Sequence, residues 1–498
     1  MNAAPRRSAD TVLLIAIAAT TLIVHVLTGG QYGFHRDELA TLNDAQHLAW
    51  GYVAYPPVTP FFGWLALRLF GTSLTGFRFF AALAMAVAVV LTGLIARDLG
   101  GSRRAQLLAA IAVVPSALGA GALMQYVAFD FLCWVLAAYC VARLLRTEDP
   151  RWCVGVGVAI GLGLLTKYSM AFFAFSIAAA LVFTGGRRYL RTRWFWIGIA
   201  VAATICLPNV LWQWRHDFVS LDFLRHIHER DVRIGRTKTF LPDQLEFLLL
   251  ALPLALAGLW WYFSGAGKRF RALGWMYLLP LMIFIVLKGR GYYMIAAYPM
   301  LFAAGSVWLE TWLPRRSNAV RLGGGTVALL CLAFNITIFA MVSLPTAAPG
   351  SHRFEWAIKN NGDLVEEFGW PELAQEVARI RDTFSPEERA RVGILAANYG
   401  EAGALSLYGP QHDLPEPISG INSYWYRGYG NPPPETLIVL GFSQRFRDRT
   451  FTSCKVAGHT PNPMLLENEE TRDHPDIFVC RGLKQSWPEF WKDFHYFG

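Results

Sequence analysis

The chain has 498 residues, of which 54% are apolar, 14% aromatic and only 16% charged, with a formal net charge of +9. A soluble protein of this length could not bury so much apolar material, so the composition excludes a soluble globular protein. It predicts a polytopic α-helical membrane protein. The sequence has no GxxxxGKS/T, GxGxxG or DxD pattern, which argues against a nucleotide-binding fold, and we expect no nucleic-acid partner.

Eleven apolar runs approach the roughly 20-residue length that a helix needs to cross a bilayer. In chain order they are residues 11–27, 77–96, 105–123, 131–145, 154–165, 172–184, 194–212, 245–263, 273–287, 293–312 and 323–344. Two of them, 154–165 and 172–184, are short. They flank Thr166-Lys167-Tyr168-Ser169, which is either a tight turn or a buried break in one longer hairpin.

Basic residues predict the orientation, because loops rich in Arg and Lys stay in the cytoplasm. With alternating spans, one side receives Arg6/Arg7, Arg97/Arg103/Arg104, Arg143/Arg146/Arg151, Arg187/Arg188/Arg191/Arg193, Lys268/Arg269/Arg271 and Arg315/Arg316/Arg321. The amino terminus is therefore expected in the cytoplasm of a cell inner (plasma) membrane protein. No small-residue cleavage pattern follows the first run, which reads as a retained signal anchor. Everything after the last span is expected on the outer face.

The character of the sequence changes after Leu344, where Pro345, Pro349 and Gly350 open a mixed polar and apolar segment of domain size, about 150 residues. We therefore divide the chain into a membrane domain, 1–344, and a periplasmic or extracellular domain, 345–498. Residues 372–383 predict an amphipathic helix, and Ser385-Pro386-Glu387-Glu388 is typical of a helix start. Residues 391–397, 436–441, 454–457 and 477–480 predict strands, so the outer domain is expected to be a small α/β domain.

Two of the seven cysteines, Cys454 and Cys480, fall in predicted outer-face strands. They could form a disulfide in an oxidising compartment, although their separation in sequence does not fix their distance in space. The other five lie in or beside the spans, where a structural thiol is the ordinary interpretation.

Two adjacent acids, Asp37 and Glu38, follow the first span on the predicted outer face. Apolar residues between Leu39 and Ala49 recur at helical spacing, which predicts an amphipathic helix lying in the membrane interface, and Tyr55-Pro56-Pro57 ends it. Acids in the first turn of a helix stabilise its dipole, so helix capping explains the pair about as well as chemistry does. Chemistry is favoured by their place at the edge of the bilayer, where uncompensated carboxylates are costly.

A third acid, Asp130, stands alone at the outer end of the fourth span. An Asp before an apolar run is a standard helix cap, which is the simpler interpretation. Acids at the same membrane depth could nevertheless converge on one pocket.

Positive charge gathers on the same face, at Lys167 and in Lys288-Gly289-Arg290-Gly291-Tyr292-Tyr293. Lys and Arg beside flexible glycines suit an anionic headgroup, and Arg can bind phosphate through paired donors. Snorkelling to lipid phosphates explains Lys288 easily and Lys167 less well.

The outer loop 215–238 is also basic and includes Arg225 and Arg230, which makes an anionic ligand plausible there. Its residues His226, His228, Glu229 and Asp231 could hold a metal ion, but solvated loops often contain such mixtures.

The order of these motifs carries a family resemblance. Arg36-Asp37-Glu38, Pro56-Pro57, Asp130, Leu165-Thr166-Lys167 and Lys288-Gly289-Arg290-Gly291-Tyr292-Tyr293 through Tyr298-Pro299 follow one another on one face. In this the chain resembles the GT-C glycosyltransferases over residues 1–344, and among them the bacterial relatives of protein O-mannosyltransferases and of the aminoarabinose transferase of lipid A. The stretches 398–404 and 419–425 resemble the outer domain of another bacterial branch.

The resemblance implies a GT-C fold and transfer of a sugar, with inversion, from a polyprenyl-phosphate-linked donor to an acceptor on the outer face. The acceptor could be a glycolipid, lipid A, a polysaccharide or a protein. Asp37 would be the base, Glu38 would orient the acceptor or share the proton, and Asp130 would lie near the acceptor. No cofactor is required by this scheme, although the acids could hold a divalent metal.

Positive groups would neutralise the phosphate of the donor: Lys167, Lys288 and Arg290, with Tyr292 and Tyr293 beside them. The aminoarabinose enzyme has a Lys immediately before its paired prolines, and Tyr55 takes that place here, so Lys167 or Arg290 would have to serve. Residues Arg36, Tyr55, Arg225 and Arg230 are candidate substrate-loop residues.

Two other classes of function remain open on the sequence. A lipid or solute transporter, or a flippase, would also place charges within spans, but the sequence shows no internal duplication of the kind many transporters have. A membrane scaffold whose outer domain binds a partner would leave the clustered acids and cations without a use.

Overall fold

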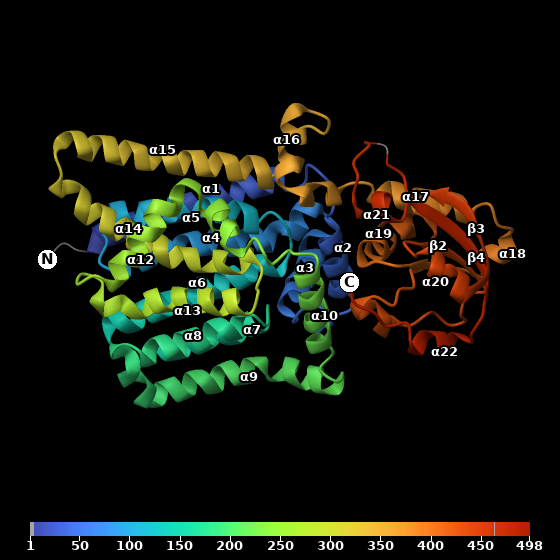
Figure 1. Ribbon diagram of the computed structural model, residues 1–498, viewed down its shortest axis with the longest axis horizontal. Helices are drawn as coiled ribbons and strands as arrows, with labels where there is room; N and C mark the ends of the chain where they lie inside the picture. Colours follow the sequence, from blue (N-terminus) through green and yellow to red (C-terminus); the bar gives the residue numbers. More distant parts are fainter. Residues whose placement is uncertain (1–3, 463) are drawn as a thin grey trace.

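The structure is a computed structural model that describes residues 4–462 and 464–498. A bundle of long helices fills one part of the molecule, and an α/β unit covers one end of it (Figure 1). The bundle consists of α1 (Ala4–Thr28), α4 (Leu74–Asp98), α5 (Arg103–Ala120), α6 (Tyr126–Thr147), α7 (Trp152–Leu164), α8 (Met170–Val182), α9 (Arg193–Arg215), α11 (Phe240–Leu248), α12 (Leu252–Phe263), α13 (Arg271–Val286), α14 (Tyr298–Trp312) and α15 (Asn318–Ser343).

Every predicted span overlaps one of these helices, but not all of them are long enough to cross a bilayer alone. In the described part of the chain, eight helical segments are long and apolar enough, or nine if α8 and the 3₁₀ helix η1 (Gly185–Arg191), which meet at 108°, form one bent span. The helix α7 has only 13 residues. The structure therefore shows a polytopic helical protein, while the expected count of eleven spans is not reached on length and composition.

Ion pairs gather the predicted basic loops at one end of the bundle. Asp98 pairs with Arg146 at 2.9 Å, and Glu148 pairs with Arg188 at 3.1 Å and with Arg269 at 3.0 Å. Four of the six predicted basic loops thus lie side by side. The α/β unit covers the other end of the bundle (Figure 1).

The long first loop forms two helices, α2 (Arg36–Gln46) and α3 (Val58–Phe70), and α2 lies between the bundle and the α/β unit (Figure 1). The apolar residues that predict contact of α2 with the membrane interface are covered by protein instead. Leu39, Leu42 and Ala45 are each 0% exposed. They are covered because α19 (Tyr399–Tyr408) of the α/β unit packs on one side of α2 and α3 packs on another. The helix α2 therefore lies inside the protein, and the predicted position in the membrane interface is wrong.

The α/β unit is built on four strands in the order β1-β2-β4-β3. The strands are β1 (Val392–Ala396), β2 (Thr436–Leu440), β3 (Phe451–His459) and β4 (Asp476–Leu483). The pair β1/β2 is parallel, and the other two pairs are antiparallel. The helices are α16 (His352–Asn360), α17 (Trp370–Arg381), α18 (Pro386–Arg389), α19, α20 (Gln444–Thr450), α21 (Glu469–Asp473) and α22 (Trp487–Lys492), and the 3₁₀ helix η6 (Gly362–Glu367) precedes α17. All four predicted strands overlap observed ones.

The two faces of the sheet belong to different cores. Ile394 and Ile438 lie in one cluster of buried side chains that runs without a break from α17 and α19 through α2 into the bundle. Leu395 and Val439, on the other face, pack with Phe490 of α22 and its neighbours. The first core joins the α/β unit to the bundle, so the end of the bundle and the unit form one packed surface.

The antiparallel pair β3/β4 brings Cys454 opposite Cys480. The structure joins these two cysteines in a disulfide.

Candidate active site

Asp37 lies where three parts of the chain meet. It occupies the first turn of α2, where the ring nitrogen Nδ1 of His35 accepts a hydrogen bond from the Asp37 amide at 3.1 Å. The Gln125 amide, just before α6, donates to Oδ2 of Asp37 at 3.0 Å, and the Tyr399 hydroxyl from α19 donates to Oδ1 at 3.0 Å. The side chain remains half-buried. Asp37 is thus a fixed carboxylate that keeps partial access to solvent.

Glu38 has a different environment although it is the next residue. It is 0% exposed, and its carboxylate accepts hydrogen bonds from Nε and Nη2 of Arg78 at 2.9 and 2.6 Å. The backbone amides of Met124, at 2.8 Å, and of His35, at 3.0 Å, complete its partners. Arg78 also donates to Glu367 of η6 at 2.9 Å. Glu38 and Glu367 therefore enclose Arg78 in a buried triad that fixes the start of α2.

Lys167 lies among three tyrosine rings. Its Nζ is 4.9 Å from the ring centre of Tyr126, 4.5 Å from that of Tyr292 and 4.1 Å from that of Tyr293. It also donates to the Tyr292 hydroxyl at 3.4 Å, and the hydroxyls of Tyr126 and Tyr292 are 3.3 Å apart. Tyrosine faces attract the ammonium group without neutralising its charge. The tyrosine cluster, meaning Tyr126, Tyr292 and Tyr293, thus holds a positive charge that is available to an anion.

The first loop and the Lys167 turn are tied together by the backbone. The amide of Val58, directly after the paired prolines, donates to the carbonyl of Leu165 at 3.0 Å. The structure therefore resolves Thr166-Lys167-Tyr168-Ser169 as the turn between α7 and α8. It places this turn beside the end of the proline segment.

Asp130 lies on α6, one turn after Tyr126. It is 7% exposed, and its Oδ1 has no hydrogen-bond partner among the described residues. A buried carboxylate oxygen without a partner is costly, so the site has one unused acceptor at this depth.

Arg290 is half-buried just before the tyrosines and donates to Asp231 of α10 (Val219–Arg233). Asp231 also lies 4.0 Å from Arg230 and 3.8 Å from Arg236. Three guanidinium groups around one carboxylate leave a net positive charge. Burial lowers the pKa of Arg230, an effect that Asp231 opposes and that Arg290 and Arg236 reinforce.

Two other predicted cations are exposed to solvent. Lys288 is exposed after the end of α13, and Arg225 is exposed on α10, where it pairs with Asp222 at 3.3 Å. The nearby His226, His228, Glu229 and Asp231 do not form a metal-binding group, and no cluster of three or more His, Cys, Asp or Glu residues able to hold a metal is found in residues 4–462 and 464–498.

Two predicted substrate-loop residues connect the first loop to the α/β unit. The Tyr55 hydroxyl donates to Asp44 at 2.6 Å, and Asp44 also accepts from Arg427. Burial and the Asp44 carboxylate raise the pKa of Tyr55, so it stays a neutral donor. Arg36 donates to Glu469, and its guanidinium carbon lies 4.8 Å from the centre of the Tyr399 ring. Arg36 therefore joins α2 to the α/β unit directly, and Tyr55 is linked to that unit through Asp44.

The sequence interpretation missed four residues around the acids: Arg78, Gln125, Tyr399 and Arg427. Arg78 had a signal, because it is a charge within the apolar run 77–96, and such charges in spans have partners or functions. The other three lie 88, 362 and 383 residues from the acids they contact, and no local pattern points to them.

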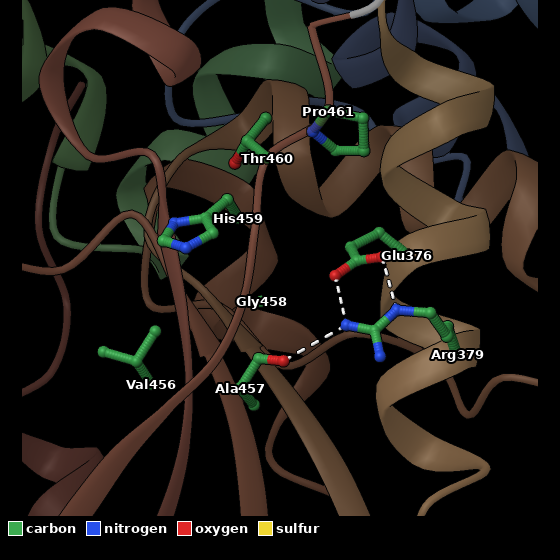
Figure 2. A pocket seen from close by; sticks show the side chains of 8 residues that line it. All are labelled: Glu376, Arg379, Val456, Ala457, Gly458, His459, Thr460 and Pro461. Carbon is green, nitrogen blue, oxygen red and sulfur yellow. Dashed lines mark hydrogen bonds and ion pairs between the residues drawn. The ribbon is translucent and has the colours of Figure 1, made fainter.

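A separate hollow lies on the outer surface of the α/β unit, between α17 and the end of β3 (Figure 2). Arg379 pairs with Glu376 at 2.6 Å and donates to the carbonyl of Ala457 at 3.2 Å. His459 pairs with Asp476 at 2.7 Å. None of the predicted site residues lines this hollow, so it is not part of the site around Asp37.

Comparisons with known proteins agree on the fold. Residues 54–212 match the family model described as dolichyl-phosphate-mannose-protein mannosyltransferase. The crystal structure of ArnT from Cupriavidus metallidurans bound to undecaprenyl phosphate superposes with a TM-score of 0.60, at 15% identity, over 94% of this chain and 98% of that one.

Curated relatives cover less of the chain. The undecaprenyl phosphate-alpha-4-amino-4-deoxy-L-arabinose arabinosyl transferase 1 of Pseudomonas fluorescens is 30% identical over 295 residues, 53% of this chain and 51% of that protein. The lipid A galacturonosyltransferase RgtD of Rhizobium johnstonii is 26% identical over 357 residues, 68% of each chain. The chain thus spans about half the length of the first of these relatives and about two thirds of the second. The fold expected from the resemblance is confirmed: the protein has the GT-C fold.

Proposed function

We propose that this protein is a membrane glycosyltransferase that moves a sugar from a polyprenyl-phosphate carrier to an envelope acceptor. The observation that carries the proposal is that a half-buried carboxylate and a cation among tyrosine rings contact successive residues at the start of α6. Gln125, which binds Asp37, is followed directly by Tyr126, whose ring lies beside Lys167. A base and an anion site are the two parts that such a transfer needs.

The chemistry follows from these positions. The acceptor hydroxyl attacks the anomeric carbon of the sugar while Asp37 takes its proton. The bond between that carbon and the phosphate oxygen breaks, its electron pair leaves with the phosphate, and attack from the opposite side inverts the anomeric centre. The leaving polyprenyl phosphate gains negative charge, which Lys167 and Arg290 stabilise. Hydroxyls of Tyr292 and Tyr293 can donate to the same phosphate oxygens.

Glu38 and Asp130 have distinct parts in this scheme. Glu38 acts on Asp37 indirectly: together with Arg78 it fixes the start of α2. Its carboxylate is already bonded to Arg78 and to the Met124 amide, so it is engaged by the protein and not by substrate. Asp130, with one oxygen unpaired among the described residues, would accept a hydrogen bond from a hydroxyl of the bound sugar or acceptor. Arg230 adds positive charge beside Arg290. The scheme needs no metal.

The relatives indicate the substrate class. Their names give undecaprenyl phosphate as the sugar carrier and lipid A as an acceptor. We therefore assign this chain an undecaprenyl-phosphate-type donor and a lipid A-type glycolipid acceptor. Undecaprenyl tails are long and apolar, so the donor would lie along the spans with its phosphate at the Lys167 end.

The basic end of the bundle supports an orientation with the amino terminus in the cytoplasm and the α/β unit outside the inner membrane. In this arrangement α5, α7 and α8 also cross, giving eleven passes. The helices α7 and α8 are short, but α7 packs along α9 and α8 along α13, and the disulfide of Cys454 and Cys480 suits an oxidising compartment.

Mass spectrometry of the envelope lipids tests the proposal. Cells lacking the gene are compared with cells that carry the wild-type gene or Asp37→Asn, at matched protein levels. We expect lipid A or its core to gain the mass of one sugar only with the wild type, because an amide cannot take the acceptor proton. A sugar transferred equally by Asp37→Asn would contradict the base, and identical glycolipid masses in all three strains would contradict the acceptor class.

A further inference from the structure

The stretch Asn398-Tyr399-Gly400-Glu401-Ala402-Gly403-Ala404 has no part in the scheme above, yet it reaches the site. It forms the start of α19, and its Tyr399 hydroxyl donates to Oδ1 of Asp37 at 3.0 Å. We propose that Tyr399 is a positioning residue of the active site, supplied by the α/β unit, which fixes the orientation of the Asp37 carboxylate toward the acceptor. This inference rests on the proposed function, because it takes Asp37 as the base.

Two glycines bring the helix close enough for this contact. A Cβ on Gly403 would lie 2.7 Å from Cβ of Leu39 on α2, and one on Gly400 would lie 3.1 Å from Cβ of Arg36. The first distance is shorter than any ordinary Cβ contact, and the second would require its neighbour to shift by a few tenths of an ångström. The two glycines are three positions apart and so share one face of α19. The backbones of α19 and α2 therefore approach closely next to Asp37.

The ring and the start of α19 are also fixed. The guanidinium carbon of Arg36 lies 4.8 Å from the centre of the Tyr399 ring. The Asn398 side chain accepts a hydrogen bond from the Glu401 amide at 2.8 Å, and Glu401 accepts from the Asn398 amide at 3.3 Å. Burial and the neighbouring Asp37 carboxylate raise the pKa of the Tyr399 phenol, so that it remains protonated and donates.

The contact is not needed to hold the two parts together. Arg36 binds Glu469, Arg427 binds Asp44, and Arg78 binds Glu367, and each is a charged pair between the α/β unit and the rest of the chain. Charged pairs of this kind are stronger than a single phenol bond. Tyr399 is therefore not needed as a structural link between the two parts. Its hydrogen bond to one oxygen of the base, in contrast, acts directly on the group that takes part in the reaction.

The two donors on Asp37 fix the orientation of its carboxylate. The Tyr399 hydroxyl donates to Oδ1 and the Gln125 amide donates to Oδ2. Each oxygen keeps a lone pair for the acceptor proton. Loss of the Tyr399 hydroxyl would leave a base that is held from one side only, so that the bound acceptor meets it less often in the reactive geometry.

The kinetic constants of the Tyr399→Phe variant test this role. Purified full-length protein is assayed for transfer to lipid A, with a host membrane lipid extract as the source of donor, and product is measured by mass spectrometry. We expect kcat to fall about tenfold, because a base that is held less firmly lowers the rate of the chemical step and not the binding of substrate. The KM for the lipid extract should stay the same.

Two hydroxyl deletions in the same unit serve as controls. Tyr429→Phe removes the hydroxyl of a ring that stacks on Trp487, and it should change nothing. Tyr496→Phe removes a hydrogen bond to the carbonyl of Ala397, two residues before Tyr399, so it loosens the same segment without touching Asp37. It should lower thermal stability but leave kcat unchanged.

The outcomes separate this inference from the proposed function. If the wild type transfers sugar and Asp37→Asn does not, but Tyr399→Phe keeps the wild-type kcat or changes only KM, Tyr399 is no positioning residue and the proposed function stands. If Tyr496→Phe lowers kcat as much as Tyr399→Phe, the effect belongs to the segment and the inference fails. If the wild type transfers nothing, the proposed function itself fails.

Discussion

Asp37 and Glu38 are neighbours in sequence but point in different directions on α2, because successive residues of a helix are about 100° apart. Helix capping therefore explains one of the two acids, and chemistry explains the other. Glu38 makes the capping bond to the His35 amide and neutralises Arg78. Asp37 keeps a half-buried carboxylate with two neutral donors. The pair is thus one structural acid and one candidate base.

At the same scale, Lys167→Ala should weaken binding of the lipid phosphate. A charge-assisted contact to phosphate contributes about 1.5–3 kcal/mol, so we expect a loss of roughly 10- to 100-fold in affinity for undecaprenyl phosphate. Binding can be followed by the thermal shift of the purified protein at increasing lipid concentration.

Two other lysines complete this experiment. Lys268→Ala, exposed at the opposite end of the bundle, should bind the lipid as the wild type does. Lys288→Ala decides whether that exposed residue adds to the phosphate site as the sequence predicts. An unchanged affinity of Lys167→Ala would remove the tyrosine cluster from the phosphate site.

At the scale of elements, the contact between α19 and α2 depends on the absence of a side chain at Gly403. Gly403→Leu should push α19 away from Leu39, because a Cβ there would already be 2.7 Å from Cβ of Leu39. We expect loss of most transfer activity and an overpacking cost of about 1–3 kcal/mol. Activity and thermal unfolding of the purified variant measure the two effects.

Gly362→Ala is the matched control, because a Cβ at Gly362 meets nothing within 4 Å. Wild-type activity and stability are expected for it. Full activity of Gly403→Leu would show that the close approach of the two helices is not needed.

Buried acids make the stability of the α/β unit depend on pH. Burial and the carboxylate of Glu470 raise the pKa of Glu401 from 4.5 to about 8. The folded state then binds a proton that the unfolded state releases. This stabilisation is fully present below pH 4.5 and is lost as the pH rises through 8.

The Glu401→Gln variant should therefore be as stable as the wild type near pH 4.5 and more stable, by roughly 1–3 kcal/mol, at pH 8 or above. Thermal unfolding across this range gives the comparison. Glu435→Gln, at an exposed ion pair with Arg391, should leave the pH dependence unchanged. A wild-type slope in Glu401→Gln would show that another group causes it.

At the scale of the whole molecule, one buried core and one buried triad join the bundle to the α/β unit. Arg78, at 3% exposure, is enclosed by Glu38 and Glu367. Removing its charge leaves two carboxylates buried without a counter-ion. Arg78→Met should therefore cost about 3–5 kcal/mol of stability.

The cost would be measured by thermal unfolding. Arg391→Met, at the exposed pair with Glu435, should cost less than about 1 kcal/mol. A similar loss in both variants would mean that the triad is not a special contact between the two parts.

The sequence predicts local features well because their causes are local. Apolar runs predict a helix in every part of the bundle, and short runs of strand-forming residues predict the four strands. The position of α2 could not be predicted, because an apolar face fits lipid and protein equally. Likewise, no local pattern indicates that Tyr399, 362 residues away, meets Asp37. The sequence thus predicts site residues that belong to one local motif. It misses residues that reach the site from a distant segment.

The buried triad also imposes an order on biosynthesis. Ribosomes deliver residue 78 to the membrane 289 residues before residue 367, so Arg78 and Glu38 must first settle as a pair. The third member, Glu367, follows α15 in the chain, so it is made only after every helix of the bundle. A nascent chain therefore completes the contact that fixes the start of α2 only late in its synthesis.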